Sequence, residues 1–273
     1  MVRQIGGNHQ DAGFSRIQTP EPVMEQSPHP PALPRLSVVL PVYDEQDCLG
    51  AVLAETVDAC SAFEDYEIVA VNDGSTDRSG EILRDLARRN PHIRVLTLTP
   101  NAGQSAALWA GFQAVRFPFT ATLDADGQND PRDIAACLRF MLDEGADVCS
   151  GIRIDRQDTW SKRVGSRFAN LIRRHVLGDG VLDTGCPLKT YRTAYLRRLQ
   201  YWNGMHRFLP VLCQNLGAKV VQWAVTHRRR LAGTSKYTNL GRLRVTIRDL
   251  AGVAWLQSRS RRFRYAEEEV LHG

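Results

Sequence analysis

Apolar residues along the chain fall into two alternating patterns. Short, mostly apolar runs, of which Leu36–Leu40 is the first, are typical of strands buried on both faces. Between these runs, apolar residues recur every three or four positions, which is typical of helices with one buried face. The predicted strands cover 36–40, 66–72, 93–98, 119–123 and 146–153, and the predicted helices cover 47–63, 79–90, a stretch that follows Gly103, and 132–143.

Strands that alternate with helices predict an α/β fold with a mostly parallel central sheet. In sheets of this kind, ligands bind outside the carboxyl ends of the strands. Polar clusters follow three of the predicted strands, at 41–45, 72–77 and 124–128. Their position predicts a ligand site at that edge of the sheet.

Composition changes near both ends of the chain. Residues 1–34 contain six prolines and few apolar residues, so we expect a disordered leader. We expect one domain over 35–240 and a basic amphipathic segment over 241–273.

Charge is unevenly distributed. The formal net charge is +5, yet residues 228–264 contain eleven Lys or Arg residues and a single acid, Asp249. Such a basic band indicates an anionic partner. No nucleic-acid-binding module is recognisable, so we expect no nucleic acid partner.

The basic band includes a predicted amphipathic helix over 240–257. Trp255 lies near its basic flank, and a basic helix with such a tryptophan can lie on an anionic membrane surface. There are two alternatives. The helix could dock on a separate membrane subunit, or its apolar stripe could pack on the body of the protein. The stripe consists of Leu240, Leu243, Ile247, Leu250 and Ala254.

The compartment follows from several features. No run approaches the roughly 18 apolar residues of a membrane-spanning helix, and the N-terminus lacks the apolar core of a secretory signal. The six cysteines are scattered without a CxxC spacing. We therefore expect a cytoplasmic protein that is peripheral on the inner face of the membrane.

Two carboxylates follow the predicted strand at 119–123. Asp124 and Asp126 are separated by one residue and point the same way from an extended chain, and Gln128 adds a carbonyl oxygen. Oxygen ligands suit a hard cation such as Mg²⁺ or Mn²⁺. A loop of solvated acids is the alternative, because the Asp-x-Asp tripeptide is common.

Other polar residues at the strand ends have two interpretations each. Asp73 is either a turn or cap acid or a hydrogen-bond partner of a base or ribose. Tyr43 could stack on a nucleobase. Glu45 could bind the edge of that base or the ribose, or it could open a helix at its positive end.

Taken together, the motifs resemble glycosyltransferase family 2. The matching stretches are 37–45, 71–77, 101–103 and 124–128, followed by 166–170, 183–185, 189–191 and 230–237. The later stretches are similar to the dolichol-phosphate mannose synthase and undecaprenyl-phosphate glycosyltransferase branch. The resemblance covers about residues 35–240 and implies the GT-A fold, a Rossmann-like sheet flanked by helices. Many relatives carry transmembrane helices after the last stretch, which this sequence does not show, and the leader is not part of the family pattern.

The resemblance also implies ligands and site residues. These ligands are a nucleotide-diphosphate-sugar (UDP or GDP), Mg²⁺ or Mn²⁺, and a polyprenyl phosphate, with a nucleotide-sugar half at 35–155 and an acceptor half at 156–240. The implied nucleotide-sugar contacts are Pro41, Tyr43, Glu45, Asp73 and Asp124, the metal ligands are Asp124, Asp126 and Gln128, and the acceptor-phosphate contacts are Arg153, Arg163, Arg167, Arg230, Ser235 and Lys236.

The expected activity is inverting transfer by a hexosyltransferase of the dolichyl-phosphate mannosyltransferase type. A phosphate acceptor is already ionised at neutral pH and needs positive charge rather than a general base. Arg228–Arg230 and Lys236 supply that charge. The expected catalytic residues are Asp124, Asp126, Arg230 and Lys236, together with Asp183 as the base if the acceptor is a hydroxyl.

Two alternative functions stay open. Transfer to a hydroxyl of a saccharide or lipid in cell-envelope polysaccharide synthesis would need a base, for which Asp183 is the candidate, although Asp183 could equally be a turn or cap acid. The second alternative is a non-catalytic membrane scaffold subunit that binds a nucleotide-sugar. The sequence leaves homo-oligomerisation open.

Overall fold

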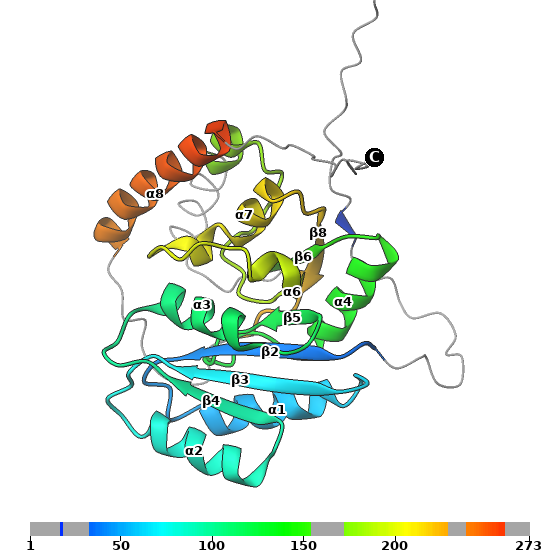
Figure 1. Cartoon of the computed structure of the whole chain (residues 1–273), viewed down its shortest axis with the longest axis vertical. Coiled ribbons are helices and arrows are strands. Elements are labelled where there is room, and N and C mark those ends of the chain that lie inside the picture. Colours follow the sequence, from blue (N-terminus) through cyan, green and yellow to red (C-terminus); the bar gives the residue numbers. More distant parts are fainter. Residues whose placement is uncertain (1–16, 19–32, 154–171, 229–238, 260–273) are drawn as a thin grey trace, which may run out of the picture.

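A twisted sheet of eight strands forms the centre of the computed structural model, which describes residues 17–18, 33–153, 172–228 and 239–259 (Figure 1). The strands lie in the order β1-β8-β6-β7-β5-β2-β3-β4. Neighbouring strands are parallel, except that β7 runs antiparallel to both β5 and β6. Their bounds are β1 (Ile17–Gln18), β2 (Leu36–Val42), β3 (Tyr66–Asn72), β4 (Ile93–Thr97), β5 (Phe119–Thr122), β6 (Val148–Arg153), β7 (Lys189–Arg192) and β8 (Val220–Val225).

Helices cover both faces of this sheet. They are α1 (Leu49–Cys60), α2 (Ser79–Arg89), α3 (Gln104–Ala114), α4 (Asp133–Asp143), α6 (Thr193–Leu196), the 3₁₀ helix η1 (Met205–Arg207), α7 (Leu209–Asn215) and α8 (Asn239–Arg259). Residues 172–177 are also helical. Apolar residues of α1, α2 and α4 share one buried cluster, and those of α3, α6, α7 and α8 share the other.

The two clusters explain why a central strand such as β2 is mostly apolar rather than alternating. In β2, Val38 and Leu40 point into the first cluster and Val39 points into the second. All three residues are fully buried. A strand covered on both faces buries every side chain, which is the pattern of a parallel sheet between two helical layers.

The predicted α/β fold is confirmed. Each strand and helix expected between residues 36 and 153 is present, and their bounds differ from the predictions by only a few residues. The strands β7 and β8 were not predicted. β7 has only four residues, and its antiparallel direction depends on pairing with strands distant in sequence.

A few residues of the expected leader lie in the part of the chain that the structure describes. Ile17–Gln18 forms β1 and pairs in parallel with β8. Leu33 is buried and makes a β-bridge with Phe63. Backbone pairing therefore connects both short pieces to the body of the protein.

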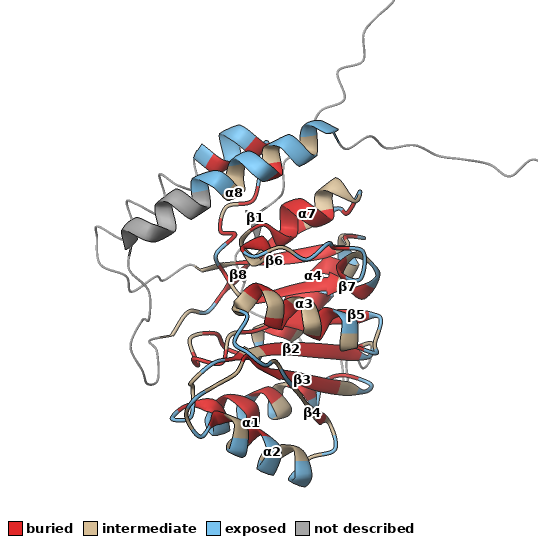
Figure 2. Ribbon diagram, turned by 60° about the vertical axis from the view of Figure 1, so that its left-hand side comes forward, coloured by how far each residue is buried: buried red, intermediate tan, exposed pale blue. Residues whose placement is uncertain are grey.

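The expected C-terminal helix is present as α8, and it is only partly covered (Figure 2). Val253 is buried, and Leu250 and Ala254 pack against the second cluster. Ile247, which we placed on the same stripe, is 59% exposed, and Trp255 is 63% exposed. Among the described helices, none is long and apolar enough to cross a bilayer.

Candidate active site

The loops after β2 and β3 are tied together at the carboxyl edge of the sheet. The main-chain N–H groups of Asp44 and Glu45 donate to Ser75 Oγ (3.0 Å) and Ser79 Oγ (2.9 Å). In return, Asp44 Oδ1 accepts from the Thr76 N–H at 2.7 Å. Asp44 has a φ of 50°, a left-handed conformation that these reciprocal bonds hold in place. The loop predicted to bind the nucleotide therefore has a fixed backbone.

Asp73 organises the turn that precedes α3. Its buried carboxylate accepts hydrogen bonds from the main-chain N–H groups of Ala102 and Gly103, both at 2.8 Å, and from Asn101 Nδ2 at 3.1 Å. This geometry matches the turn or cap role that the sequence left open. Asp73 thus joins the loop after β3 to the start of α3.

The Asp124–Asp126 segment is held from two sides. Gln104 Nε2 donates to Asp124 Oδ1 at 2.9 Å. From the other side, Cys48 Sγ lies 3.2 Å from the Ala125 carbonyl oxygen and 3.4 Å from Glu45 Oε2. The three polar clusters predicted at the strand ends are therefore connected in one site. The sequence analysis did not identify Gln104 as a site residue, although Gln104 directly follows the 101–103 motif.

The oxygen donors at this edge suit a hard cation. Asp126 is almost buried, and its Oδ1 accepts the Gln128 N–H at 3.1 Å. The neighbouring Asn129 amide is also buried, and both of its polar atoms lack a protein partner in the structure. In the part of the chain that the structure describes, no group of three His, Cys, Asp or Glu residues forms a metal cluster. Asp124, Asp126 and Gln128 could hold a cation whose remaining ligands are oxygens of a bound diphosphate.

Arg153 and Asp183, to which the sequence assigned separate roles, form an ion pair. Arg153 Nε and Nη2 donate to the two carboxylate oxygens of Asp183 at 2.7 and 2.8 Å. The side chains are 13% and 8% exposed. A bidentate guanidinium stabilises the ionised carboxylate and occupies both of its oxygens. The pair therefore makes Asp183 a poor general base and balances the charge of Arg153.

Lys189 supports the turn that carries Asp183. Its buried ammonium donates to the carbonyl oxygens of Thr184, at 3.2 Å, and Cys186. Burial lowers the pKa of Lys189, and nearby Asp183 opposes that shift. The sequence marked Lys189 only as part of a motif, whereas the structure shows which carbonyl groups it binds.

His206 is a further polar residue near the site that the sequence did not indicate. Its Nδ1 lies 2.7 Å from Ser105 Oγ, and Ser105 directly follows Gln104. The Gly204 N–H also donates to Ser105 Oγ at 2.9 Å. No periodic pattern marks this contact, because it joins positions about 100 residues apart.

The remaining predicted residues are placed as follows. Pro41 lies within β2, and Tyr43, directly after that strand, is 36% exposed. Arg163, Arg167, Arg230, Ser235 and Lys236 lie outside the described residues. Their predicted contacts with the acceptor phosphate stay predictions.

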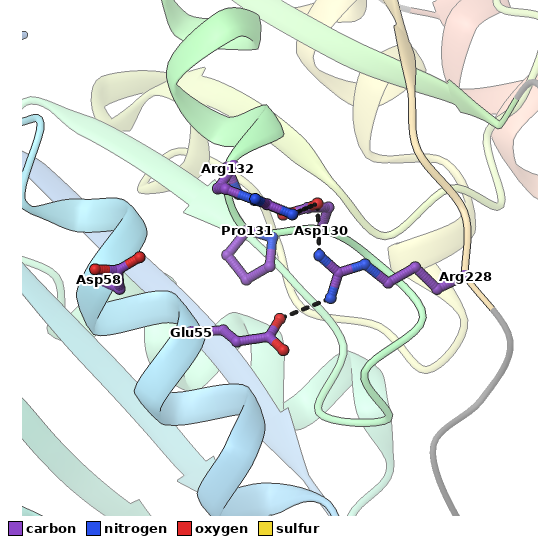
Figure 3. A pocket seen from close by; sticks show the side chains of 6 residues that line it. All are labelled: Glu55, Asp58, Asp130, Pro131, Arg132 and Arg228. Carbon is purple, nitrogen blue, oxygen red and sulfur yellow. Dashed lines mark hydrogen bonds and ion pairs between the residues drawn. The ribbon is translucent and has the colours of Figure 1, made fainter.

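Arg228 differs from its expected role as a phosphate contact. It lines a pocket of about 210 Å³ together with Glu55, Asp58, Asp130, Pro131 and Arg132 (Figure 3). Its guanidinium makes ion pairs with the carboxylates of Glu55 and Asp130. The charge of Arg228 is thus balanced within the protein.

Comparison with known proteins identifies the family. The model of glycosyl transferase family 2 matches residues 37–202. The chain belongs to this family. The matched stretch contains the linked loops after β2, β3 and β5, and the family resemblance of the motifs is confirmed.

Similar family 2 proteins include two curated bacterial enzymes. The chain is 40% identical over 205 residues to the undecaprenyl-phosphate 4-deoxy-4-formamido-L-arabinose transferase of Edwardsiella ictaluri, covering 74% of this chain and 62% of that protein. It is 38% identical over 209 residues to the enzyme of the same name from an Enterobacter species, covering 76% of this chain and 64% of that protein. The chain thus spans less than two thirds of the length of these relatives.

Solved structures confirm the GT-A fold. Glucosyl-3-phosphoglycerate synthase from Mycobacterium tuberculosis, solved with Mn²⁺, UDP and glucosyl-3-phosphoglycerate, aligns with a TM-score of 0.58 at 18% identity. The alignment covers 82% of this chain and 79% of that one. The same enzyme solved with Mg²⁺ and UDP aligns equally well. At this identity, the likeness concerns the fold alone.

Proposed function

We propose that this family 2 enzyme transfers a sugar from a nucleotide-diphosphate-sugar to undecaprenyl phosphate or a related polyprenyl phosphate. The Arg153–Asp183 ion pair carries the proposal. Transfer to a hydroxyl requires a base, and the candidate base has both carboxylate oxygens bound to a guanidinium. A phosphate acceptor requires no base. The names of the two bacterial relatives support the same acceptor.

The donor would bind at the carboxyl edge of β2, β3 and β5. Tyr43, Glu45 and Asp73 lie on the loops that would hold the nucleoside. Asp124, Asp126 and Gln128 would hold Mg²⁺ or Mn²⁺, and the cation would neutralise charge on the diphosphate. The hydrogen bonds from Gln104 and Cys48 keep this segment in position before the donor arrives.

The reaction is a single displacement. An oxygen of the acceptor phosphate forms a bond to the anomeric carbon while the bond from that carbon to the nucleotide diphosphate breaks on the opposite face. The sugar configuration inverts, the nucleoside diphosphate leaves, and no proton is transferred. Arg230 and Lys236, with Arg163 and Arg167, would offset repulsion between the anionic acceptor and the anionic donor.

The nature of the sugar is a finer part of the proposal. Mannose is the sugar of the branch that the motifs resemble, whereas the relatives at about 40% identity are named for a formamido-arabinose, a pentose derivative. We infer that a UDP-linked pentose derivative is the first donor to test, ahead of a GDP-linked hexose.

We also infer that the protein acts at the inner face of the membrane, where α8 meets the lipid. The exposed side chains of Ile247, Trp255 and Leu256 on α8 support this placement, together with exposed Arg248. An amphipathic helix with these features binds at the interface between water and lipid.

A donor and acceptor panel tests the proposal. Purified protein is incubated with UDP-pentose, UDP-hexose or GDP-hexose donors, with and without Mn²⁺, and with undecaprenyl phosphate or undecaprenol. We expect a glycosyl-phospholipid by mass spectrometry only with the phosphate acceptor and Mn²⁺. We also expect Lys236→Ala to lower turnover at least about ten-fold.

Each other outcome of the panel favours an alternative. Product with undecaprenol would favour transfer to a hydroxyl. Donor binding without transfer or hydrolysis by any combination would favour a scaffold subunit.

A further inference from the structure

The chain leaving β8 runs antiparallel to the loop after Asp126. The Thr226 N–H donates to Asp133 Oδ2 at 2.7 Å. His227 forms an antiparallel bridge with Asn129, and the Arg228 N–H donates to the Gln128 carbonyl oxygen at 2.7 Å. The main chain of residues 226–228 therefore fixes the path of residues 128–130.

The Arg228 side chain adds a second attachment to the same loop. Its Nη2 lies 2.5 Å from Asp130 Oδ2, and its Nη1 lies 2.7 Å from Glu55 Oε2 on α1 (Figure 3). Arg132 also binds the Asp130 carboxylate, at 2.7 Å, but its own side chain is 73% exposed. Arg228 thus connects the loop to α1 by an ion pair, whereas Arg132 binds Asp130 from a position two residues further along the same chain segment.

The charges around Arg228 are set by its neighbours in the pocket. Three acids, Glu55, Asp58 and Asp130, line this pocket with two arginines, Arg132 and Arg228, so no net positive charge is offered to a phosphate.

Movement of Gln128 would reach the predicted metal ligands directly. The Gln128 N–H donates to Asp126 Oδ1 at 3.1 Å, so the position of its main chain sets the orientation of that carboxylate. The carbonyl oxygen of the same residue is the acceptor for the Arg228 N–H. The two bonds form a continuous connection from the main chain of Arg228 to Asp126. The side chain of Arg228 anchors this connection to α1.

We infer that Arg228 is a positioning residue that clamps the loop carrying Asp126 and Gln128 onto α1, and so sets the affinity for the cation and the donor diphosphate. The inference rests on the proposed function, because it assumes that this loop binds a nucleotide diphosphate with a divalent cation. It replaces the direct phosphate contact that the sequence indicated for Arg228.

Calorimetric titration with UDP in the presence of Mn²⁺ tests the clamp. We expect Arg228→Ala to raise the Kd for UDP about ten-fold or more. The matched control, Arg132→Ala, removes an arginine from the same carboxylate but leaves the link to α1, so we expect a Kd within about two-fold of wild type. Arg228→Lys keeps the charge with one donor group and should restore part of the affinity.

Two titration results would overturn the clamp: an unchanged Kd for UDP in Arg228→Ala, or equal losses of UDP affinity in Arg228→Ala and Arg132→Ala.

Amide hydrogen exchange in the free protein provides a test that needs no ligand. Exchange over residues 126–130 should be faster in Arg228→Ala, and also in Arg228→Lys, than in Arg132→Ala. Equal exchange in all three variants would also contradict the clamp. Wild-type protein that binds neither UDP nor Mn²⁺ would instead contradict the proposed function, while the exchange data would still decide the role of Arg228.

Discussion

At the scale of single residues, several basic side chains in the described part of the chain are balanced by acids that lie far away in sequence. Arg153 pairs with Asp183, and Arg207 lies 3.2 Å from Asp249 on α8. Arg228 joins Glu55, which precedes it by 173 positions. The sequence correctly indicated which residue types gather at the strand ends. It could not show these pairings, since tertiary packing alone brings the partners together, and it therefore assigned Arg153 and Arg228 to phosphates.

The low pKa of Asp130 predicts how stability depends on pH. The pKa falls from 3.8 to about 2 on folding, so the ionised carboxylate stabilises the native state at pH values above the unfolded pKa. This contribution should disappear as the pH falls from about 4 toward 2. We expect Asp130→Asn to lower the free energy of unfolding by about 1 kcal/mol at pH 7, measured by urea titration.

The matched control is Asp85→Asn, at an exposed pair with Arg88 on α2. Its effect should be within about 0.5 kcal/mol at every pH. A difference between wild type and Asp130→Asn that stayed constant from pH 7 to pH 2.5 would contradict the assigned ion pairs.

At the scale of elements, the position of α3 depends on close contact with the sheet. A Cβ added at Gly111 would lie 2.4 Å from Val39 Cγ1 on β2. Because both Gly111 and Val39 are buried, α3 approaches β2 more closely than a larger residue permits. The first residue of α3 is Gln104, which binds Asp124, so this approach also determines how the helix meets the site.

Gly111→Ala should therefore destabilise the protein even though alanine favours helices. We expect a loss of about 1–3 kcal/mol from overpacking, measured by urea or thermal unfolding. Adding Val39→Ala should recover part of that loss by making room for the new methyl group.

Gly252→Ala on α8 serves as the control. No atom lies within 4 Å of its added Cβ, so the substitution should stabilise the helix by about 0.5–1 kcal/mol. Equal effects of Gly111→Ala and Gly252→Ala would contradict close packing of α3 on β2.

At the scale of the whole molecule, the sequence predicted the half that contains residues 36–153 much better than the half that follows. In the first half, β2 and β3 are mostly apolar runs and α1, α2 and α4 have an apolar face, so local patterns match the tertiary structure. In the second half, β7 is short and antiparallel, and α6 and α7 have four and seven residues. Such elements are too short to show a clear hydrophobic period. Their conformation depends on the strands and helices that pack against them.

The exposed surface of α8 predicts where the protein binds membranes. In Figure 1, α8 lies at the opposite end of the molecule from α2. Gln257 Nε2 donates to the Leu177 carbonyl oxygen, which links α8 to helical residues 172–177, where Ile172 and Val176 are exposed. We expect Arg248→Glu to weaken binding to vesicles that contain anionic phospholipid about ten-fold or more at low salt, measured by flotation.

Arg88→Glu on α2 is the matched control for this prediction. It changes the net charge equally, at an exposed position on the distant helix, so vesicle binding should change less than about two-fold. Equal weakening by both variants would indicate that only net charge matters. Failure of wild-type protein to bind the vesicles at low salt would favour docking on a membrane protein instead.

The antiparallel direction of β7 brings the chain back to the edge of the sheet at which β6 ends. Lys189, the first residue of β7, pairs with Ser150 of β6 and Thr122 of β5, so it lies at the same edge of the sheet as Asp124. The chain between Arg153 and Lys189 therefore leaves this edge and returns to it. We expect a change in the length of this segment to leave the register of β1, β8 and β6 on one side of β7, and of β5, β2, β3 and β4 on the other, unchanged. A lineage could thus acquire a new acceptor by altering this excursion while the residues that would hold the nucleotide stay as they are.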